Sequence, residues 1–320
     1  MKLYFAPLQG YTTATYRRLH HAIWGGIESY YTPFVRIEKN EFRRKDLNDI
    51  APENNTDTPV VPQMLPGNAD ELRQTAELFL KNGYTQADIN MGCPFPPIAL
   101  HRRGSGILPY IDIVSKILTA TAEFPELKFS VKMRLGWQSS TDWTHLIDIL
   151  NSTLLQHITM HPRIGKAQYK GCVDLEQFTA FYEQCQHATI YNGDLNTIQD
   201  INNIHKQFPR LAGVMLGRGL LARPYLTTLL DGDTANIFAI INETKIFHDK
   251  LYNELAATSQ GDSQLLNRAQ ALWEYFLPQT PRKERKAIVK ATSPVQYLKS
   301  VDRLFTAWES ENSNSNVILM

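Results

Sequence analysis

The sequence lacks long hydrophobic runs, has few cysteines and carries almost no net charge. No apolar stretch approaches the roughly 18 residues that cross a bilayer, and Pro7 interrupts the short apolar segment at the start of the chain. We therefore expect neither a membrane span nor a signal peptide. The three cysteines, Cys93, Cys172 and Cys185, are widely spaced, which argues against a disulfide framework or a zinc ribbon. These absences predict a cytoplasmic protein.

Charge and composition exclude further classes of protein and of binding site. Lys and Arg total 33 while Asp and Glu total 32, so the net charge is +1 and only a local patch could attract a nucleic acid. Hydrophobic residues make up 43% of the 320, which provides for a sizeable core and excludes wholesale disorder. No second histidine or carboxylate stands at metal-ligand spacing from His161, so we predict no metal site.

Eight short apolar, β-branched or aromatic runs recur along the chain, about 25–40 residues apart. Helical patterns fill the gaps, as at 69–83 and 111–124, where apolar residues recur at i, i+3, i+4 and i+7. This alternation predicts an α/β fold, a (β/α)8 TIM barrel, with a doubly wound parallel sheet as the alternative. The runs cover residues 3–7, 28–35, 59–64, 86–91, 128–134, 156–161, 188–192 and 212–217.

The pattern becomes purely helical after about residue 232, and the DGDT segment at 231–234 has the composition of a linker. Ser293 to Gln296 has the spacing of a capping box, with Pro294 at the first helical position. Gly83 stands where a helix would end. We therefore predict a barrel over 1–232, a small helical domain over 235–308 and a disordered tail over 309–320.

Nearly every predicted strand ends in polar or glycine residues, and in a parallel barrel the chemistry lies at these ends. A polar residue at one strand end is common and is weak evidence for a functional site, but polar or glycine residues at eight successive strand ends are stronger evidence. The ends carry Pro7, Leu8 and Gln9; Arg36; Gln63; Asn90 and Cys93; Lys132 and Arg134; His161 and Arg163; Asn192, Gly193 and Asp194; and Gly217 and Arg218.

Two glycine turns follow the last two strands, NGD at 192–194 and GRG at 217–219. Backbone N–H groups at such turns can hold a phosphate, and the loops after strands seven and eight are the usual phosphate site of this fold. Two ordinary glycine turns are the alternative. Cys93 is a candidate reactive thiol because Gly92 and Pro94 fix its backbone at a strand end, although an isolated cysteine is often buried and inert.

A basic segment near the C-terminus could hold a nucleic-acid backbone. Its only acid is Glu284. The alternative is a solvated helix face. The segment contains Arg282, Lys283, Arg285, Lys286 and Lys290.

Several motifs, in order, resemble those of the tRNA-dihydrouridine synthases, flavin enzymes that reduce specific uridines in tRNA. They include APLQG, DINMGCP, SVKMRLGW, the H-x-R of HPRIGKAQYKG, NGD and GVMLGRGLLARPYL, and they span about residues 3–228. TPFVRI and RLGW are most similar to the bacterial C-type branch. PFPPI departs from the family because prolines stand where a basic residue is usual, and Pro162 replaces a usual glycine.

The resemblance implies an FMN-containing barrel joined to a helical tRNA-binding domain, with NADPH as electron donor and a D-loop uridine as target. Cys93 would be the proton donor. The flavin would contact Pro7, Leu8, Gln9, Gln63, Lys132 and His161, with its phosphate on Asn192, Gly193, Asp194, Gly217 and Arg218. The tRNA would contact Arg36, Asn90, Arg134 and Arg163, and we add Arg282, Lys283, Arg285 and Lys286 from the basic segment.

Two other functions stay open. An FMN barrel oxidoreductase that acts on a free pyrimidine, like a dihydroorotate dehydrogenase, would share the phosphate turns and could use a cysteine, but it would not need the basic helices. A non-catalytic RNA-binding barrel is supported only by the PFPPI departure.

Overall fold

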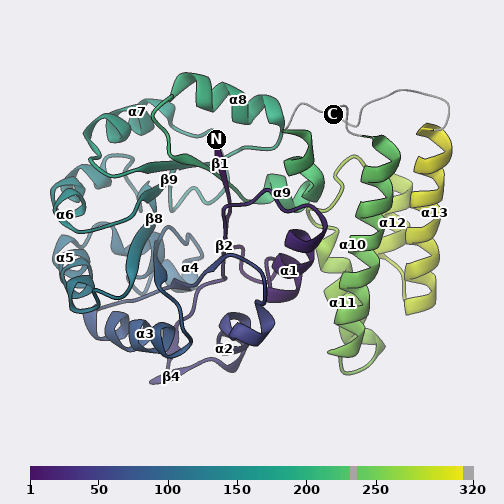
Figure 1. Cartoon of the computed structure of the whole chain (residues 1–320), viewed down its shortest axis with the longest axis horizontal. Coiled ribbons are helices and arrows are strands. Elements are labelled where there is room, and N and C mark those ends of the chain that lie inside the picture. The colour runs from purple at the N-terminus through teal and green to yellow at the C-terminus, as the bar shows by residue number, and fades with distance from the viewer. Residues whose placement is uncertain (231–235, 313–320) are drawn as a thin grey trace. The chain divides into compact units, whose positions relative to one another are not determined.

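The computed structural model describes residues 1–230 and 236–312, and its larger part is built around a parallel β-sheet with helices outside it (Figure 1). The strand order is β5-β2-β1-β11-β10-β9-β8-β7-β6. The strands are β1 Lys2–Phe5, β2 Ser29–Tyr31, β5 Val60–Val61, β6 Gln63–Met64, β7 Gln86–Met91, β8 Lys128–Gly136, β9 Ile158–Ile164, β10 Thr189–Asn192 and β11 Gly213–Leu216.

The two edge strands, β5 and β6, are pieces of a single run, the one predicted at 59–64. Pro62 separates them because it has no N–H to give to the ladder, while its carbonyl accepts from the Asp88 N–H at 2.9 Å. β5 pairs with β2 and β6 pairs with β7, so this one segment closes the sheet into a barrel. The predicted barrel is confirmed, and the doubly wound sheet is excluded.

Helices follow most strands of the barrel, and a small antiparallel hairpin, β3 with β4, follows β2. The hairpin strands are Ile37–Glu38 and Glu41–Phe42. The α-helices up to residue 222 are α1 Ala14–Ile23, α2 Arg44–Ile50, α3 Ala69–Lys81, α4 Pro96–Ala99, α5 Ile111–Ala120, α6 Ile147–Ser152, α7 Leu175–Gln184, α8 Ile198–Gln207 and α9 Arg218–Ala222. Short 3-10 helices lie at Pro52–Asn54, Gly104–Ile107, Thr121–Glu123, Asp142–His145 and Pro224–Leu229.

The ends of α3 show how local sequence sets an element. Asn68 caps the start, since its side-chain oxygen accepts from the Glu71 N–H at 2.9 Å. Gly83 ends it with a φ of 80°, and the next N–H, of Tyr84, reaches back to the Phe79 carbonyl at 3.1 Å. The predicted stop at Gly83 is confirmed.

The chain divides into two compact units. The first holds residues 1–14, 27–194 and 202–217, and the second holds residues 15–26, 195–201 and those from 218 onward. The predicted linker at 231–234 lies outside the described residues, so the domain boundary at residue 232 stays a prediction.

Four helices make up most of the second unit: α10 Ile237–Ala257, α11 Asp262–Leu272, α12 Arg282–Val289 and α13 Pro294–Asn312. α13 packs against the other three (Figure 1). In their core the Tyr297 hydroxyl lies 2.8 Å from His248 Nε2 and accepts from Trp273 Nε1 at 2.9 Å. None of the described helices is long and apolar enough to cross a membrane.

α13 begins as predicted, with Pro294 first and the Gln296 N–H donating to Ser293 Oγ at 3.3 Å. It continues to Asn312, so residues 309–312 are helical where the sequence predicts a tail. The rest of that tail, 313–320, lies outside the described residues.

Candidate active site

The register of the parallel strands stacks polar side chains in levels on one face of the sheet. Alternate residues of a strand share a face, and paired residues of neighbouring strands lie side by side. Buried apolar residues, such as Ile89 and Val131, occupy the positions between them. The first level holds Gln63, Asp88 and Ser130, the second Asn90, Lys132 and Thr159, and the third Arg134 and His161.

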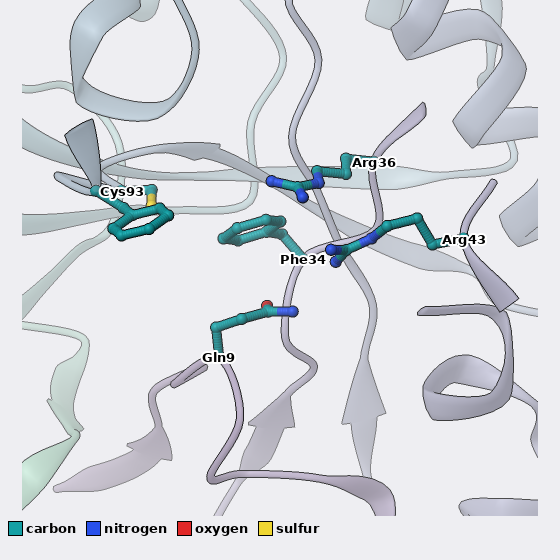
Figure 2. A pocket seen from close by; sticks show the side chains of 6 residues that line it. Gln9, Phe34, Arg36, Arg43 and Cys93 are labelled. Atoms are coloured by element: carbon teal, nitrogen blue, oxygen red, sulfur yellow. The ribbon is translucent and has the colours of Figure 1, made fainter. Parts of the chain in front are cut away.

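A cavity of about 180 Å³ lies beside the end of this stack. The predicted residues Cys93, Gln9 and Arg36 line it, although they come from loops after three different strands. Figure 2 shows their side chains turned toward the same space as Arg43. The remaining lining residues are Phe34 and Phe95.

The loop that carries Cys93 is held from both sides. The Cys93 N–H donates to Asn90 Oδ1 at 2.8 Å, and the Cys93 carbonyl accepts from the N–H and the hydroxyl of Ser105, at 3.0 and 2.9 Å. Gly104 packs on this loop so closely that a Cβ there would lie 2.7 Å from the Cys93 carbonyl oxygen. Burial raises the pKa of the Cys93 thiol, so the group is protonated at neutral pH and can donate a proton.

Lys132 presents a half-buried positive charge two residues before Arg134 on the same face of β8. Burial, together with the charge of Arg134, lowers the pKa of Lys132 to about 8, although Asp88 opposes this shift. Among residues 1–230 and 236–312, no carboxylate forms an ion pair with Lys132. The Thr159 hydroxyl, in the same level, is buried with no hydrogen-bond partner in that part of the chain. These two groups are suited to an anionic or polar ligand.

Asp88 is a functional candidate that the sequence analysis missed. Its carboxylate is fully buried and accepts from Gln63 Nε2 at 2.7 Å and from Ser130 Oγ at 2.6 Å. Burial raises the pKa of Asp88 to about 7. Asp88 is the one charged residue in the predicted strand at 86–91, and that is the signal that could have identified it.

Three predicted RNA contacts, Asn90, Arg134 and Arg163, are buried, with exposed fractions of 8%, 2% and 5%. Arg134 donates to the carbonyls of Gly92, Ile164 and Gln168 at 3.0, 3.0 and 2.6 Å. In this structure it therefore ties together the loops after β7 and β9.

Arg163 forms an ion pair with Asp194, donates to the Gly171 carbonyl at 2.8 Å, and lies 3.1 Å from Nε2 of His161. His161 thus faces a fixed positive charge. The contact of Arg163 with RNA stays a prediction.

The predicted phosphate turn after β10 lies beside the end of β11, because Asn192 is paired with Met215 and donates to its carbonyl at 2.7 Å. Gly193 and Asp194 both have positive φ angles, 148° and 48°. At Gly217 a Cβ would make only ordinary contacts, 3.5 Å and more, with the side chains of Leu8 and Ala6.

β1 pairs with β11, and this pairing brings Pro7, Leu8 and Gln9 to the same end of the barrel. Arg218, which opens α9 in the second unit, stays a prediction as a phosphate contact.

Arg43 is a cavity residue that the motifs did not identify. It follows the β3–β4 hairpin, and Asp46, which is 3% exposed, accepts from Arg43 Nε and Nη2 at 2.9 and 2.6 Å. Arg36 on the opposite side of the hairpin forms an ion pair with Glu38. The cavity therefore has two arginines with fixed positions.

The basic segment on α12 divides into two kinds of residue. Arg282, Lys283 and Lys286 are exposed, whereas Arg285 is half-buried and donates to the carbonyls of Trp273, Phe276 and Leu277. Burial lowers the pKa of Arg285. Arg285 therefore holds the turn that follows α11, and its predicted contact with RNA would compete with those hydrogen bonds.

The described part of the chain contains no group of three or more His, Cys, Asp or Glu side chains that could hold a metal ion. Cys172 is exposed and Cys185 is half-buried, and neither lines the cavity.

Comparison with known proteins gives a family match over most of the chain. The family model described as Dihydrouridine synthase matches residues 4–307. The tRNA-dihydrouridine synthase B of Pasteurella multocida is 24% identical over 257 residues, which are 76% of this chain and 74% of that protein. The tRNA-dihydrouridine(16) synthase of Neisseria meningitidis serogroup B is 28% identical over 233 residues, 70% of this chain and 69% of that protein.

Among solved structures, morphinone reductase in complex with tetrahydroNAD has the same fold. Its TM-score is 0.52 at 10% sequence identity, over 72% of this chain and 86% of that chain.

Proposed function

Because this chain belongs to the dihydrouridine synthase family, we propose that it reduces one uridine in the D-loop of tRNA to 5,6-dihydrouridine, with NADPH as electron donor and Cys93 as proton donor. Family membership makes it a flavin-dependent tRNA-dihydrouridine synthase. The choice of uridine, of NADPH and of Cys93 is the part that we add. Assignment to the C-type branch rests on TPFVRI and RLGW alone.

The observation that carries the proposal is the position of Cys93. A protonated thiol lines a cavity together with two fixed arginines and two phenylalanines, beside the ends of the central strands. The cavity thus combines a proton donor, positive charge and apolar ring faces. A base in a polyanionic chain needs these three features for reduction at a carbon–carbon double bond.

The residues fit FMN, which the family implies. Lys132 and the Thr159 hydroxyl offer a positive charge and a buried polar group without ion-pair or hydrogen-bond partners in the described residues. Gly217, where a Cβ would make only ordinary contacts, lies at the strand end beside the turn that Gly193 forms, and glycine turns of this kind can hold a phosphate. We propose that FMN is held there non-covalently, with Pro7, Leu8 and Gln9 against the ring and Gln63 at its polar edge.

When bound, the reduced flavin supplies the hydride that adds to C6 of the uracil. The Cys93 thiol then gives its proton to C5, and the raised pKa keeps the thiol protonated until that point. Lys132 stabilises negative charge that develops beside it. Since a stacked uridine cannot enter a cavity of this kind, it must leave the stack, which costs a few kcal/mol. Arg36 and Arg43 can offset that cost by holding the nucleotide.

The test is the reaction itself, with the purified protein, NADPH and defined substrates. We expect a yellow protein that releases FMN on heat denaturation and forms dihydrouridine in unmodified tRNA transcripts but does not reduce free uridine or orotate. A colourless protein would support the RNA-binding alternative, and turnover of orotate would support the free-pyrimidine enzyme.

Mapping of dihydrouridine in tRNA from a strain that lacks the gene would identify the target. We expect one D-loop position to lose the modification and to regain it with the parent gene. Loss at a position outside the D-loop would contradict the assignment.

A further inference from the structure

We propose that Asp88 is a positioning residue for Cys93, acting through Gln63 and Asn90. The carboxylate fixes the direction of a hydrogen-bond chain that ends on the backbone N–H of Cys93. The inference rests on the proposed role of Cys93 as proton donor, because only that role gives the orientation of its thiol a consequence.

The hydrogen-bond chain from Asp88 to Cys93 has three links. Gln63 Nε2 donates to Asp88 Oδ2 at 2.7 Å, and Asn90 Nδ2 donates to Gln63 Oε1 at 2.7 Å. The N–H groups of Gly92 and Cys93 then donate to Asn90 Oδ1, at 3.0 and 2.8 Å. A continuous path therefore runs from a buried carboxylate to the turn that bears the thiol.

The direction of the path follows from the chemistry of its ends. A primary amide can rotate by 180°, which exchanges its donor with its acceptor. Since Asp88 Oδ2 accepts, Gln63 must turn its NH2 group toward Asp88 and its oxygen toward Asn90. Asn90 must then donate to Gln63, which leaves Asn90 Oδ1 for the backbone of Cys93. Reversal of either amide would place an NH2 group against an N–H donor.

Burial makes this direction strict. Asp88 and Gln63 are 0% exposed and Asn90 is 8% exposed, so water cannot replace a lost partner easily. The charged and titratable groups that face Asp88 are Lys132 on β8 and Tyr31 on β2. If Asp88 takes up a proton, the Ser130 hydroxyl on Oδ1 can reverse and accept it. The Gln63 link then persists, because Oδ2 still accepts.

Three isosteric variants test the chain without opening a cavity. Each is made in the full-length protein as purified, with Cys172→Ser and Cys185→Ser, so that iodoacetamide reports on Cys93 alone. Gln63→Glu places two carboxylates where a donor met an acceptor, so the chain survives only while they share a proton. As pH rises above neutrality we expect the alkylation rate of Cys93 to exceed the parent curve by about tenfold, the effect of one lost buried link.

Rescue distinguishes positioning from a general loss of stability. In the double variant Gln63→Glu with Asp88→Asn, the amide at 88 donates to the new carboxylate, which still accepts from Asn90. Asp88→Asn alone gives position 88 a donor as well as an acceptor, so the direction is no longer fixed from this end, and Cys93 should be alkylated faster than in the parent. The double variant should follow the parent pH profile within about threefold.

A Gln63→Glu variant that follows the parent at every pH, or a double variant that does not restore the profile, would overturn the proposal. Alkylation needs neither NADPH nor tRNA, and the FMN content of each variant separates loss of the hydrogen-bond chain from loss of the flavin that Gln63 is proposed to contact. If the chain behaves as expected while Cys93→Ala still forms dihydrouridine at the parent rate, the assignment of Cys93 as proton donor is what fails.

Discussion

At the scale of single residues, the site separates groups that meet a ligand from groups that hold them in place. Cys93, Arg36 and Arg43 line the cavity. Asp46 holds Arg43, and Arg134 donates to the Gly92 carbonyl one residue before the thiol. The burial of Arg134 therefore suits a supporting role for a residue type that is usually expected on the surface.

Cys93→Ala should leave reduction of the flavin by NADPH intact and slow dihydrouridine formation by about 100-fold or more, because a general acid contributes roughly that factor. Stopped-flow absorbance measures the first step, and nucleoside analysis of tRNA measures the second. Cys172→Ala is the matched control because that thiol is exposed and does not line the cavity.

In the parent, tRNA reduction should stay level through neutral pH, since the raised pKa of Cys93 keeps its thiol protonated there, and should decline from about pH 8, as Lys132 loses its charge. Parent-like turnover in Cys93→Ala would exclude the proton-donor role.

Asp88 should make the folded state less stable as pH rises. Its pKa is about 7 when folded and about 3.9 in an unfolded chain, so the folded state binds an additional proton between these values. The free energy of unfolding should therefore fall as pH rises from about 4 to 7. Urea unfolding at several pH values measures the slope, and Asp88→Asn should flatten it. An unchanged slope in that variant would show that Asp88 titrates normally.

The residues missed by the sequence analysis share a physical reason. The motifs pointed to residues at strand ends, and Cys93, Gln9 and Arg36 do line one cavity. Asp88 lies inside a strand, and its importance depends on Gln63 and Ser130, which come from other strands of the barrel. Such long-range pairings require the register of the sheet, which no local pattern contains.

At the scale of elements, the barrel was predictable because short apolar, β-branched or aromatic runs alternate with helical patterns along the chain. The hairpin β3–β4 was not predictable from its turn. Its central residues Lys39 and Asn40 have positive φ angles, 51° and 65°, where such turns usually carry Asn-Gly. The division of the third run follows from Pro62, because proline has no N–H to donate to the ladder inside a strand.

Gly104 and Gly83 provide a matched pair of element ends. Both have positive φ, 56° and 80°, but a Cβ at 83 has nothing within 4 Å, whereas one at 104 would lie 2.7 Å from the Cys93 carbonyl oxygen. Gly83→Ala should cost about 1 kcal/mol of unfolding free energy, from backbone strain alone. Gly104→Ala should cost about 2 kcal/mol or more, because the clash adds to the strain.

Chemical denaturation measures the loss of unfolding free energy in both variants. Iodoacetamide alkylation measures whether Gly104→Ala also changes the reactivity of Cys93. We expect Cys93 to react faster in Gly104→Ala and at the parent rate in Gly83→Ala. Equal costs and equal alkylation rates would mean that the loop relaxes without moving the thiol.

At the scale of the whole molecule, a net charge of +1 requires that a polyanion be held by local groups of positive charge. α12 has three exposed cations and a fourth, Arg285, that donates to the backbone carbonyls of Phe276 and Leu277. A change at all four would therefore mix two effects, loss of RNA contacts and loss of stability. The structure allows them to be separated.

The triple variant Arg282→Gln, Lys283→Gln and Lys286→Gln should weaken tRNA binding and flatten its salt dependence by about one unit or more in the log–log slope, because fewer counterions are released. Filter binding at several salt concentrations measures this, and FMN content and NADPH oxidation should equal those of the parent. Arg285→Gln should instead lower the free energy of unfolding, since it removes the donor from three backbone carbonyls. If the triple variant binds tRNA as the parent does at every salt concentration, α12 is only a solvated face, and the RNA contacts belong with Arg36 and Arg43 at the cavity.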